Sequence, residues 1–143
     1  MEEILIQLAT AFTGPMGFAL LFGLRRKDLF ASSMGGVIAW GVYLIVQAWT
    51  EAGFLSCLAA AAVAVIYAEV LAHGFKTPAT LFAIPAILPL VPGSSLYYAM
   101  NSAVRGDLAS AREHGVQTLV YTLAIAAGIS LVTALRQLRT KKQ

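Results

Sequence analysis

IPAILPLVPGSSLYYAM, residues 84–100, decides how this chain folds. The stretch is apolar enough for the interior of a bilayer, yet it carries Pro85, Pro89, Pro92 and Gly93 within nine residues. Each proline lacks a backbone N–H, and its ring clashes with the carbonyl four residues earlier, so a regular helix cannot continue. An unpaired carbonyl is costly in hydrocarbon, and such a break is tolerated only inside protein or beside water. The stretch therefore predicts a broken membrane helix.

Gly93, Ser94 and Ser95 follow the prolines and predict the start of a second half-helix. Glycine provides a flexible joint, and serine hydroxyls are suited to cap a helix N-terminus. Many transporters build a substrate site from such a fresh N-terminus at mid-depth in the membrane. The alternative is a proline-kinked helix that only packs against its neighbours. Because three prolines, a glycine and two serines occur together, we favour the substrate site.

Tyr97 and Asn101 extend this predicted site. On a helix that begins near Ser94 they share one face, since they lie four residues apart, and Ser94 lies one turn below. In the alternative interpretation, Tyr97 and Tyr98 belong to an aromatic girdle at the membrane edge. The predicted substrate-binding residues are Pro89, Pro92, Gly93, Ser94, Ser95, Tyr97 and Asn101.

The composition identifies an integral membrane protein. Of 143 residues, 59% are hydrophobic and 12% charged, and the mean hydropathy is +0.76. A soluble domain of this length would need more polar surface. The net charge of +3 does not indicate nucleic-acid binding, because the basic residues gather at the ends of apolar stretches. The N-terminus carries acidic residues where a signal peptide carries basic ones, so we expect a retained first span.

Five apolar stretches predict an all-α integral membrane protein with one transmembrane domain, residues 1–143. About 20 residues of helix cross roughly 30 Å of hydrocarbon. The expected spans are residues 4–24, 29–48, 54–72, 79–104 (broken near 89–95) and 116–135.

The basic residues predict the orientation. Five spans place the termini on opposite sides of the membrane. One side receives eight Lys and Arg residues, in the cluster 25–27, at Lys76 and in the C-terminal tail, and the other receives Arg105 and Arg112. Because basic residues concentrate on the cytoplasmic side, we expect the N-terminus outside and the C-terminus in the cytoplasm.

Glu69 is the acidic residue that this assignment places inside a span. A carboxylate there, with His73 and Lys76 within two turns, forms a candidate proton or charge relay. The alternative is an interfacial glutamate paired with His73 or Lys76. His73 has no accompanying Cys, His or Asp cluster, so we expect no metal. Without H-E-x-x-H, G-x-S-x-G or paired carboxylates at helical spacing, we expect no catalytic residues and no cofactor.

A longer pattern runs from Ala68 to Met100. It consists of Ala68-Glu69-x-x-Ala72-His73, Lys76-Thr77-Pro78-Ala79-Thr80, Phe82-x-x-Pro85-x-x-x-Pro89-Leu90-Val91-Pro92-Gly93, Tyr97 and Met100. This pattern is similar to the threonine/serine exporter family, and in particular to the short integral-membrane subunit of its split, two-gene members. The resemblance implies half of a ten-span carrier, completed by a longer membrane subunit, that exports small carboxylate-bearing metabolites such as threonine, serine or succinate.

Two functions from different classes fit the sequence. We favour the membrane subunit of a secondary exporter in the cell membrane. The alternative is a small structural or pore-forming, holin-like membrane protein, which the basic tail and the Gly- and Ala-rich spans would also suit. Five spans and a triple-proline break count against it.

Overall fold

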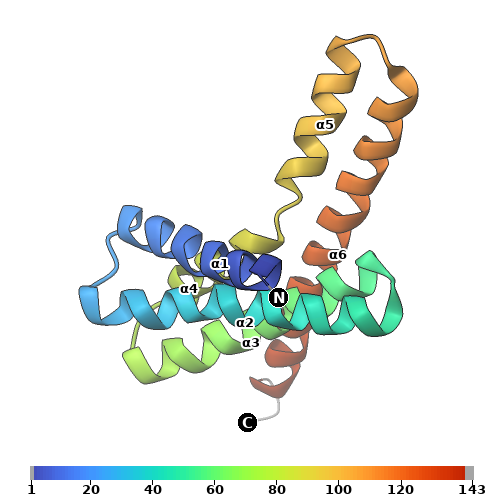
Figure 1. Cartoon of the computed structure of the whole chain (residues 1–143). Helices are drawn as coiled ribbons and strands as arrows, with labels where there is room; N and C mark the ends of the chain where they lie inside the picture. The colour runs from blue at the N-terminus through green and yellow to red at the C-terminus, as the bar shows by residue number, and fades with distance from the viewer. Residues whose placement is uncertain (1, 141–143) are drawn as a thin grey trace.

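The computed structural model describes residues 2–140, except for the side chains of Lys27, Arg139 and Thr140, and all its regular secondary structure is helical (Figure 1). The fold is therefore all-α, as predicted. The elements are α1 (Glu2–Leu21), α2 (Arg26–Thr50), α3 (Gly53–Phe75), α4 (Thr80–Ile87), the 3₁₀ turn η1 (Leu88–Leu90), α5 (Gly93–Val104) and α6 (Leu108–Thr140).

Several of these helices are long and apolar enough to cross a membrane. Within the described residues the segments that qualify are Glu2–Leu21, Asp28–Thr50, Gly53–Phe75 and Leu108–Leu138. The segments Thr80–Leu90 and Gly93–Val104 qualify as a pair, but they are bent by 53° at their junction. The chain thus has four candidate spans, or five if the bent pair forms one span, and the multi-span prediction is confirmed at that level.

The region between α4 and α5 follows from its prolines. Pro85 is accommodated inside α4, but regular α-helix ends at Ile87, two residues before Pro89. Leu88–Leu90 tightens into a 3₁₀ turn, and Val91 is extended. The second helix begins at Gly93, immediately after Pro92. Regular helix therefore stops where the missing proline N–H groups interrupt its hydrogen bonds.

Small residues allow the helices of the bundle to approach closely. A Cβ added at Gly36 would lie 2.5 Å from the carbonyl oxygen of Ala11, and one added at Gly128 would lie 2.6 Å from that of Leu58. Such contacts between backbones are typical of membrane helices, where small residues line the interfaces. The buried core is rich in alanine and includes Leu90, the last residue of η1. The 3₁₀ turn therefore packs against the centre of the bundle. The buried members of this core are Ala39, Cys57, Ala60, Ala61, Ala64, Ala86, Leu90, Ala124 and Ile125.

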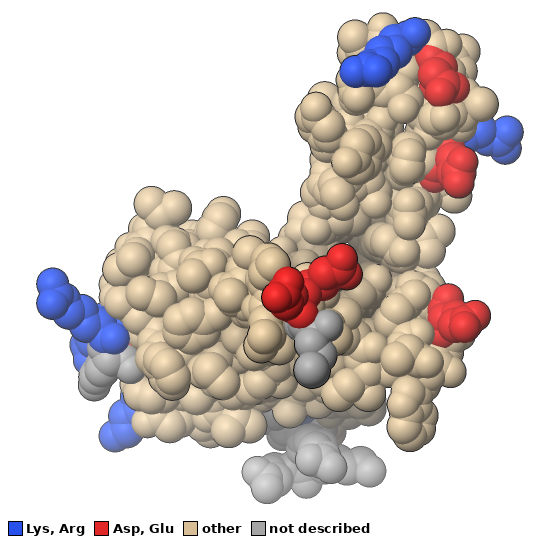
Figure 2. Space-filling model, viewed as in Figure 1, with Lys and Arg blue, Asp and Glu red and all other residues tan. Residues whose placement is uncertain are grey.

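α6 runs parallel to α3 and extends beyond it. Gly53, at the start of α3, lies against Tyr121, and Glu69, near the end of α3, pairs with Arg136. The residues of α6 before Tyr121 leave the bundle and pair with α5, forming the projecting hairpin in the upper half of Figure 1. We call residues 93–120 the hairpin. Most of the surface visible in Figure 2 is uncharged, and charged side chains gather at few places, including the tip of this hairpin.

Candidate functional site

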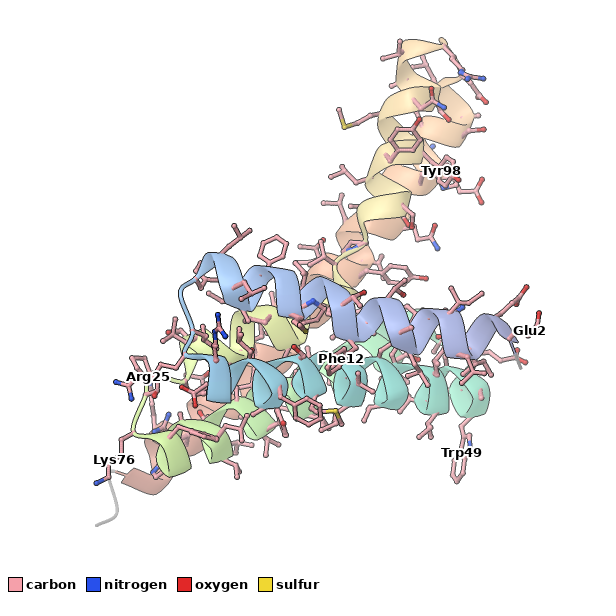
Figure 3. The ribbon with its side chains drawn as sticks, turned by 60° about the vertical axis from the view of Figure 1, so that its left-hand side comes forward. Glu2, Phe12, Arg25, Trp49, Lys76 and Tyr98 are labelled. Carbon is pink, nitrogen blue, oxygen red and sulfur yellow. The ribbon has the colours of Figure 1, made fainter. Side chains whose placement is uncertain are left out.

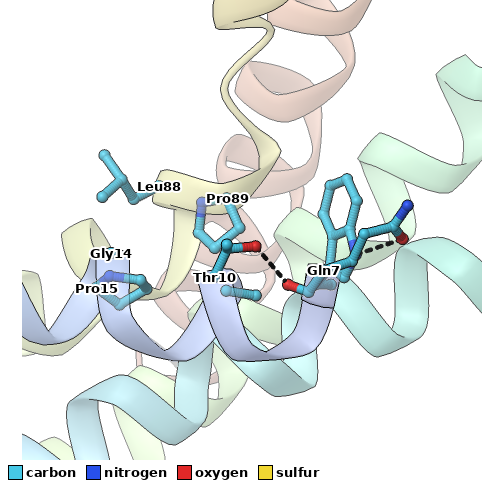
Figure 4. A pocket seen from close by; sticks show the side chains of 8 residues that line it. Gln7, Thr10, Gly14, Pro15, Leu88 and Pro89 are labelled. Atoms are coloured by element: carbon cyan, nitrogen blue, oxygen red, sulfur yellow. Dashed lines mark hydrogen bonds between the residues drawn. The ribbon is translucent and has the colours of Figure 1, made fainter. Parts of the chain in front are cut away.

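A cavity of about 260 Å³ lies between α1, α2 and η1, directly beside the interrupted segment (Figure 4). It is smaller than pockets for drug-sized ligands, which span roughly 300–1,000 Å³, so it suits a small metabolite. Its lining residues are Gln7, Thr10, Ala11, Gly14 and Pro15 of α1, Trp40 of α2, and Leu88 and Pro89 of η1.

Two prolines shape the walls of the cavity. Pro15 lies inside α1 and is buried, and its missing N–H leaves the Ala11 carbonyl without its usual helical partner. α2 approaches α1 at this point, since both Ala11 and Pro15 contact the position of Gly36. On the opposite wall, Pro89 holds η1 in its tight turn. The cavity is therefore built where two helices of the bundle depart from regular hydrogen bonding.

The cavity carries neutral polar groups on one side. The indole Nε1 of Trp40 donates to Oε1 of Gln7 at 3.4 Å, which holds the amide in place. The hydroxyl of Thr10 donates to the backbone oxygen of Gln7 at 2.9 Å and keeps lone pairs to accept a hydrogen bond. The amide nitrogen of Gln7 donates no hydrogen bond to the described residues, so it is available to a solute. Since no charged residue lines the cavity, it suits a small solute with both polar and apolar parts.

The start of α5 lies close to this cavity in the chain, because Pro89 and Gly93 are four residues apart. The N–H of Gly93 donates to the carbonyl of Val91 at 2.7 Å, and no side chain caps the helix. Ser94 is exposed and Ser95 is buried. α5 runs outward from the bundle in Figure 1, so the N–H groups of its first turn point back toward η1.

The structure brings only part of the predicted substrate site together. Among the predicted residues, Pro89 lines the cavity, whereas Tyr97 is 64% exposed on the hairpin. Tyr98 packs against His114, with ring centroids 5.6 Å apart, and Asn101 is half-buried on the same hairpin. Gly93 does not have a positive φ, and a Cβ there would meet nothing within 4 Å. Tyr97 and Asn101 therefore lie on a different surface from the cavity.

In the candidate relay, Glu69 forms an ion pair, but not with either of the expected partners, His73 and Lys76. Oε1 of Glu69 lies 3.1 Å from the guanidinium of Arg136, so its partner comes from α6 and not from His73 or Lys76. The Nδ1 of His73 lies 3.2 Å from the backbone oxygen of Glu69. Lys76 is exposed and ends α3 in a left-handed conformation, with φ 53°. None of the three predicted relay residues lines the cavity.

Gln7, Thr10 and Trp40 were missed in the sequence. The sequence does contain a signal for two of them, because Thr10 lies one turn and Gln7 two turns before Gly14-Pro15 in a largely apolar span. In a membrane helix, polar residues close to a proline indicate a face that is turned away from lipid. Within residues 2–140, no cluster of three or more His, Cys, Asp or Glu side chains is arranged to hold a metal ion.

A comparison with protein-family models places the chain in a known family of transporters. Residues 7–135 match the model described as "Threonine/Serine exporter, ThrE", which covers nearly the whole chain. No curated protein and no solved structure matches the chain. Together with the apolar helices, the family match identifies a multi-pass cell-membrane protein of the exporter type. The chain belongs to the threonine/serine exporter family.

Proposed function

We propose that this chain is the membrane subunit of a secondary exporter for small carboxylate-bearing metabolites, and that the cavity beside η1 holds the solute. The metabolites are amino acids such as threonine and serine, or dicarboxylates such as succinate. The observation that carries the proposal is the position of the cavity. It opens to the surface between α1, α2 and η1, next to the segment where regular helix stops, and substrate sites of transporters are commonly built beside such interrupted helices.

The neutral groups of the cavity and the N-terminus of α5 suit different parts of such a solute. Gln7 and Thr10 offer a hydrogen-bond donor and an acceptor to a hydroxyl or amino group, and Trp40 and Pro89 offer an apolar wall. The first turn of α5 carries roughly half a positive charge, which favours a carboxylate. Because the Gly93 N–H donates to Val91, the N–H groups of Ser94 and Ser95 are the ones that would bind it. Since no lysine or arginine lines the cavity, we assign the carboxylate to this first turn, at Gly93–Ser95.

We further propose that α4, η1 and α5 form one broken span, with the N-terminus of the chain outside and the C-terminus in the cytoplasm. Figure 3 shows Arg25 and Lys76 at one end of the bundle, with Glu2 and Trp49 at the other. The basic end therefore agrees with the cytoplasmic side that the positive-inside rule assigns.

A longer membrane subunit of the same family is proposed to cover the hairpin. α5 packs on α6, and otherwise makes almost no contact with the described helices. Ten large apolar side chains of the hairpin and the adjoining turn of α6 are between 37% and 88% exposed: Leu96, Tyr97, Tyr98, Met100, Val104, Leu108, Val116, Leu119, Val120 and Leu123. Counting from Tyr121 to Leu108 at 1.5 Å per residue, the hairpin extends about 20 Å past the start of α3. An apolar surface that far beyond the neighbouring helices favours a protein partner.

The test is solute efflux from cells that express this chain with and without the longer subunit. We expect efflux of threonine, serine or succinate only when both chains are present, and a strong preference for the acid over the corresponding amide. Transport of neither solute class by the pair, at normal levels of membrane-inserted protein, would contradict the exporter function. Equal transport of acid and amide would contradict the carboxylate site alone.

A further inference from the structure

Asp28 and Ser32 of α2 are buried, and each has a side-chain oxygen without a hydrogen-bond partner among the described residues. Asp28 is 4% exposed and Ser32 is fully buried. Neither Oδ1 of Asp28 nor the hydroxyl of Ser32 has a hydrogen-bond partner among the described residues. In the sequence, Asp28 directly follows the basic cluster 25–27 and precedes the expected second span, residues 29–48. In the structure it lies in the first turn of α2, among buried residues.

The neighbouring Ser33 forms a hydrogen bond that Ser32 lacks. The hydroxyl of Ser33 donates to the carbonyl of Leu29 at 2.8 Å, which is the usual way for a serine to satisfy itself in a membrane helix. Ser32 makes no such bond. A buried carboxylate oxygen without a partner costs several kcal/mol, and ionisable residues inside membrane bundles are mostly functional. These two oxygens are therefore open to a ligand.

The two residues lie on a face of α2 that leads to the solute cavity. Positions 28, 32, 36 and 40 follow one another at intervals of one helical turn. Gly36 packs on Pro15, which forms a cavity wall, and Trp40 lines the cavity. At 1.5 Å per residue, Asp28 lies about 18 Å from Trp40 along α2. Asp28 and Trp40 thus lie on either side of Gly36, where α2 approaches α1 closely.

We propose that Asp28 and Ser32 form a binding site for a small cation, H⁺ or Na⁺, whose movement is coupled to solute export. The inference rests on the proposed transport function for its coupling role, but not for the binding itself. A carboxylate oxygen and a hydroxyl oxygen are ligands that suit either cation: the carboxylate accepts a proton, and both oxygens coordinate Na⁺.

Few other charged or titratable groups belong to the elements packed against α2. α4 and η1 carry none, and α1 carries Glu2 and Glu3 at its opposite end. α3 contributes Tyr67, whose hydroxyl donates to the carbonyl of Ala31, and the Glu69 that pairs with Arg136 of α6. Tyr43, Glu51 and Cys57 lie toward the C-terminal end of α2, away from Asp28. The remaining groups are the exposed residues Arg25, Arg26, His73 and Lys76, and Lys27, whose side chain lies outside the described part. Asp28 is thus the buried carboxylate at this end of α2.

The binding test measures the thermal unfolding midpoint of the purified full-length chain in detergent, with its partner subunit if one copurifies. Na⁺ is compared with N-methylglucamine at fixed pH, and pH is varied in the absence of Na⁺. We expect one of the two cations to stabilise the wild type, and Asp28→Asn to lose that response. Ser32→Ala should weaken the apparent affinity about tenfold, since one ligand is lost. Asp107→Asn, at the exposed tip of the hairpin, is the matched control and should respond as the wild type does.

Transport in proteoliposomes then tests the coupling. Asp28→Asn should lose solute accumulation driven by a gradient of the cation, while it keeps solute-for-solute exchange, which needs no net cation movement. A cation response in Asp28→Asn equal to that of the wild type would overturn the site. If Asp28→Asn does not insert, an unchanged affinity in Ser32→Ala overturns it instead. Absence of all solute transport would contradict the proposed function, whereas the unfolding measurement would still decide whether the cation binds.

Discussion

Substituting Gly36 tests how closely α1 and α2 must approach to form the cavity. A Cβ at this position would lie 2.5 Å from the carbonyl oxygen of Ala11 and 2.5 Å from Cγ of Pro15. An ordinary carbon–oxygen contact is about 3.3 Å, so Gly36→Ala must separate the two helices by about 0.8 Å. Neither neighbour can yield easily, because one is backbone and the other is a proline ring. Overpacking of this kind costs about 1–3 kcal/mol.

Gly41→Ala supplies the matched control on the same helix. A Cβ there would meet nothing within 4 Å, so this variant only gains helix propensity, about 1 kcal/mol. Gly36→Ala makes the same gain, and the two variants should therefore differ by the clash alone, about 1–3 kcal/mol. The assay is reversible unfolding of the purified chain in mixed micelles by SDS, combined with solute affinity. Equal stability and equal affinity in the two variants would refute the close packing of α1 on α2 as the basis of the cavity.

Three further predictions concern the ion pair, the orientation and the hairpin. Glu69→Gln should cost no more than about 1 kcal/mol, because its partner Arg136 is half-exposed and such pairs are weak; loss of transport at normal protein level would favour the relay instead. A cysteine at Ser110, in a cysteine-free background, should react with an impermeant reagent in intact cells; labelling only after permeabilisation would reverse the orientation. Leu119→Lys should release the partner subunit during purification in mild detergent, and Glu113→Lys, on the same hairpin, should not; retention of the partner by Leu119→Lys would argue against the hairpin as its binding surface.

Local effects could be predicted from the sequence. The loss of regular helix around Pro89 and Pro92 follows from the proline rings themselves, and the membrane spans follow from runs of apolar residues. The family resemblance rests on the same stretch and is confirmed by the match over residues 7–135. Whether α4 and α5 belong to one membrane span remains a prediction, because the bend of 53° also suits a re-entrant loop.

Contacts between distant segments could not be predicted. The cavity needs Gln7 and Thr10 of α1 beside Pro89, more than 70 residues away, and no local pattern reports that approach. The burial of Asp28 could not be predicted, because three basic residues precede it and a run of charged residues usually lies in a solvent-exposed turn. Gly128 of α6 packs closely against α3, and the two helices run parallel. Arg136 therefore lies beside Glu69, which is far away in the sequence.

Protection of a cysteine in the cavity tests the solute site most directly. Thr10→Cys, in a background where Cys57 is replaced by alanine, places a thiol in the cavity lining, and Ser110→Cys places one on the hairpin as a control. A small maleimide would be applied to the exporter in proteoliposomes, with and without saturating threonine, serine or succinate. We expect a transported solute to slow labelling of Thr10→Cys severalfold and to leave Ser110→Cys unchanged. Labelling of Thr10→Cys at the same rate with and without every transported solute would contradict the cavity as the solute site.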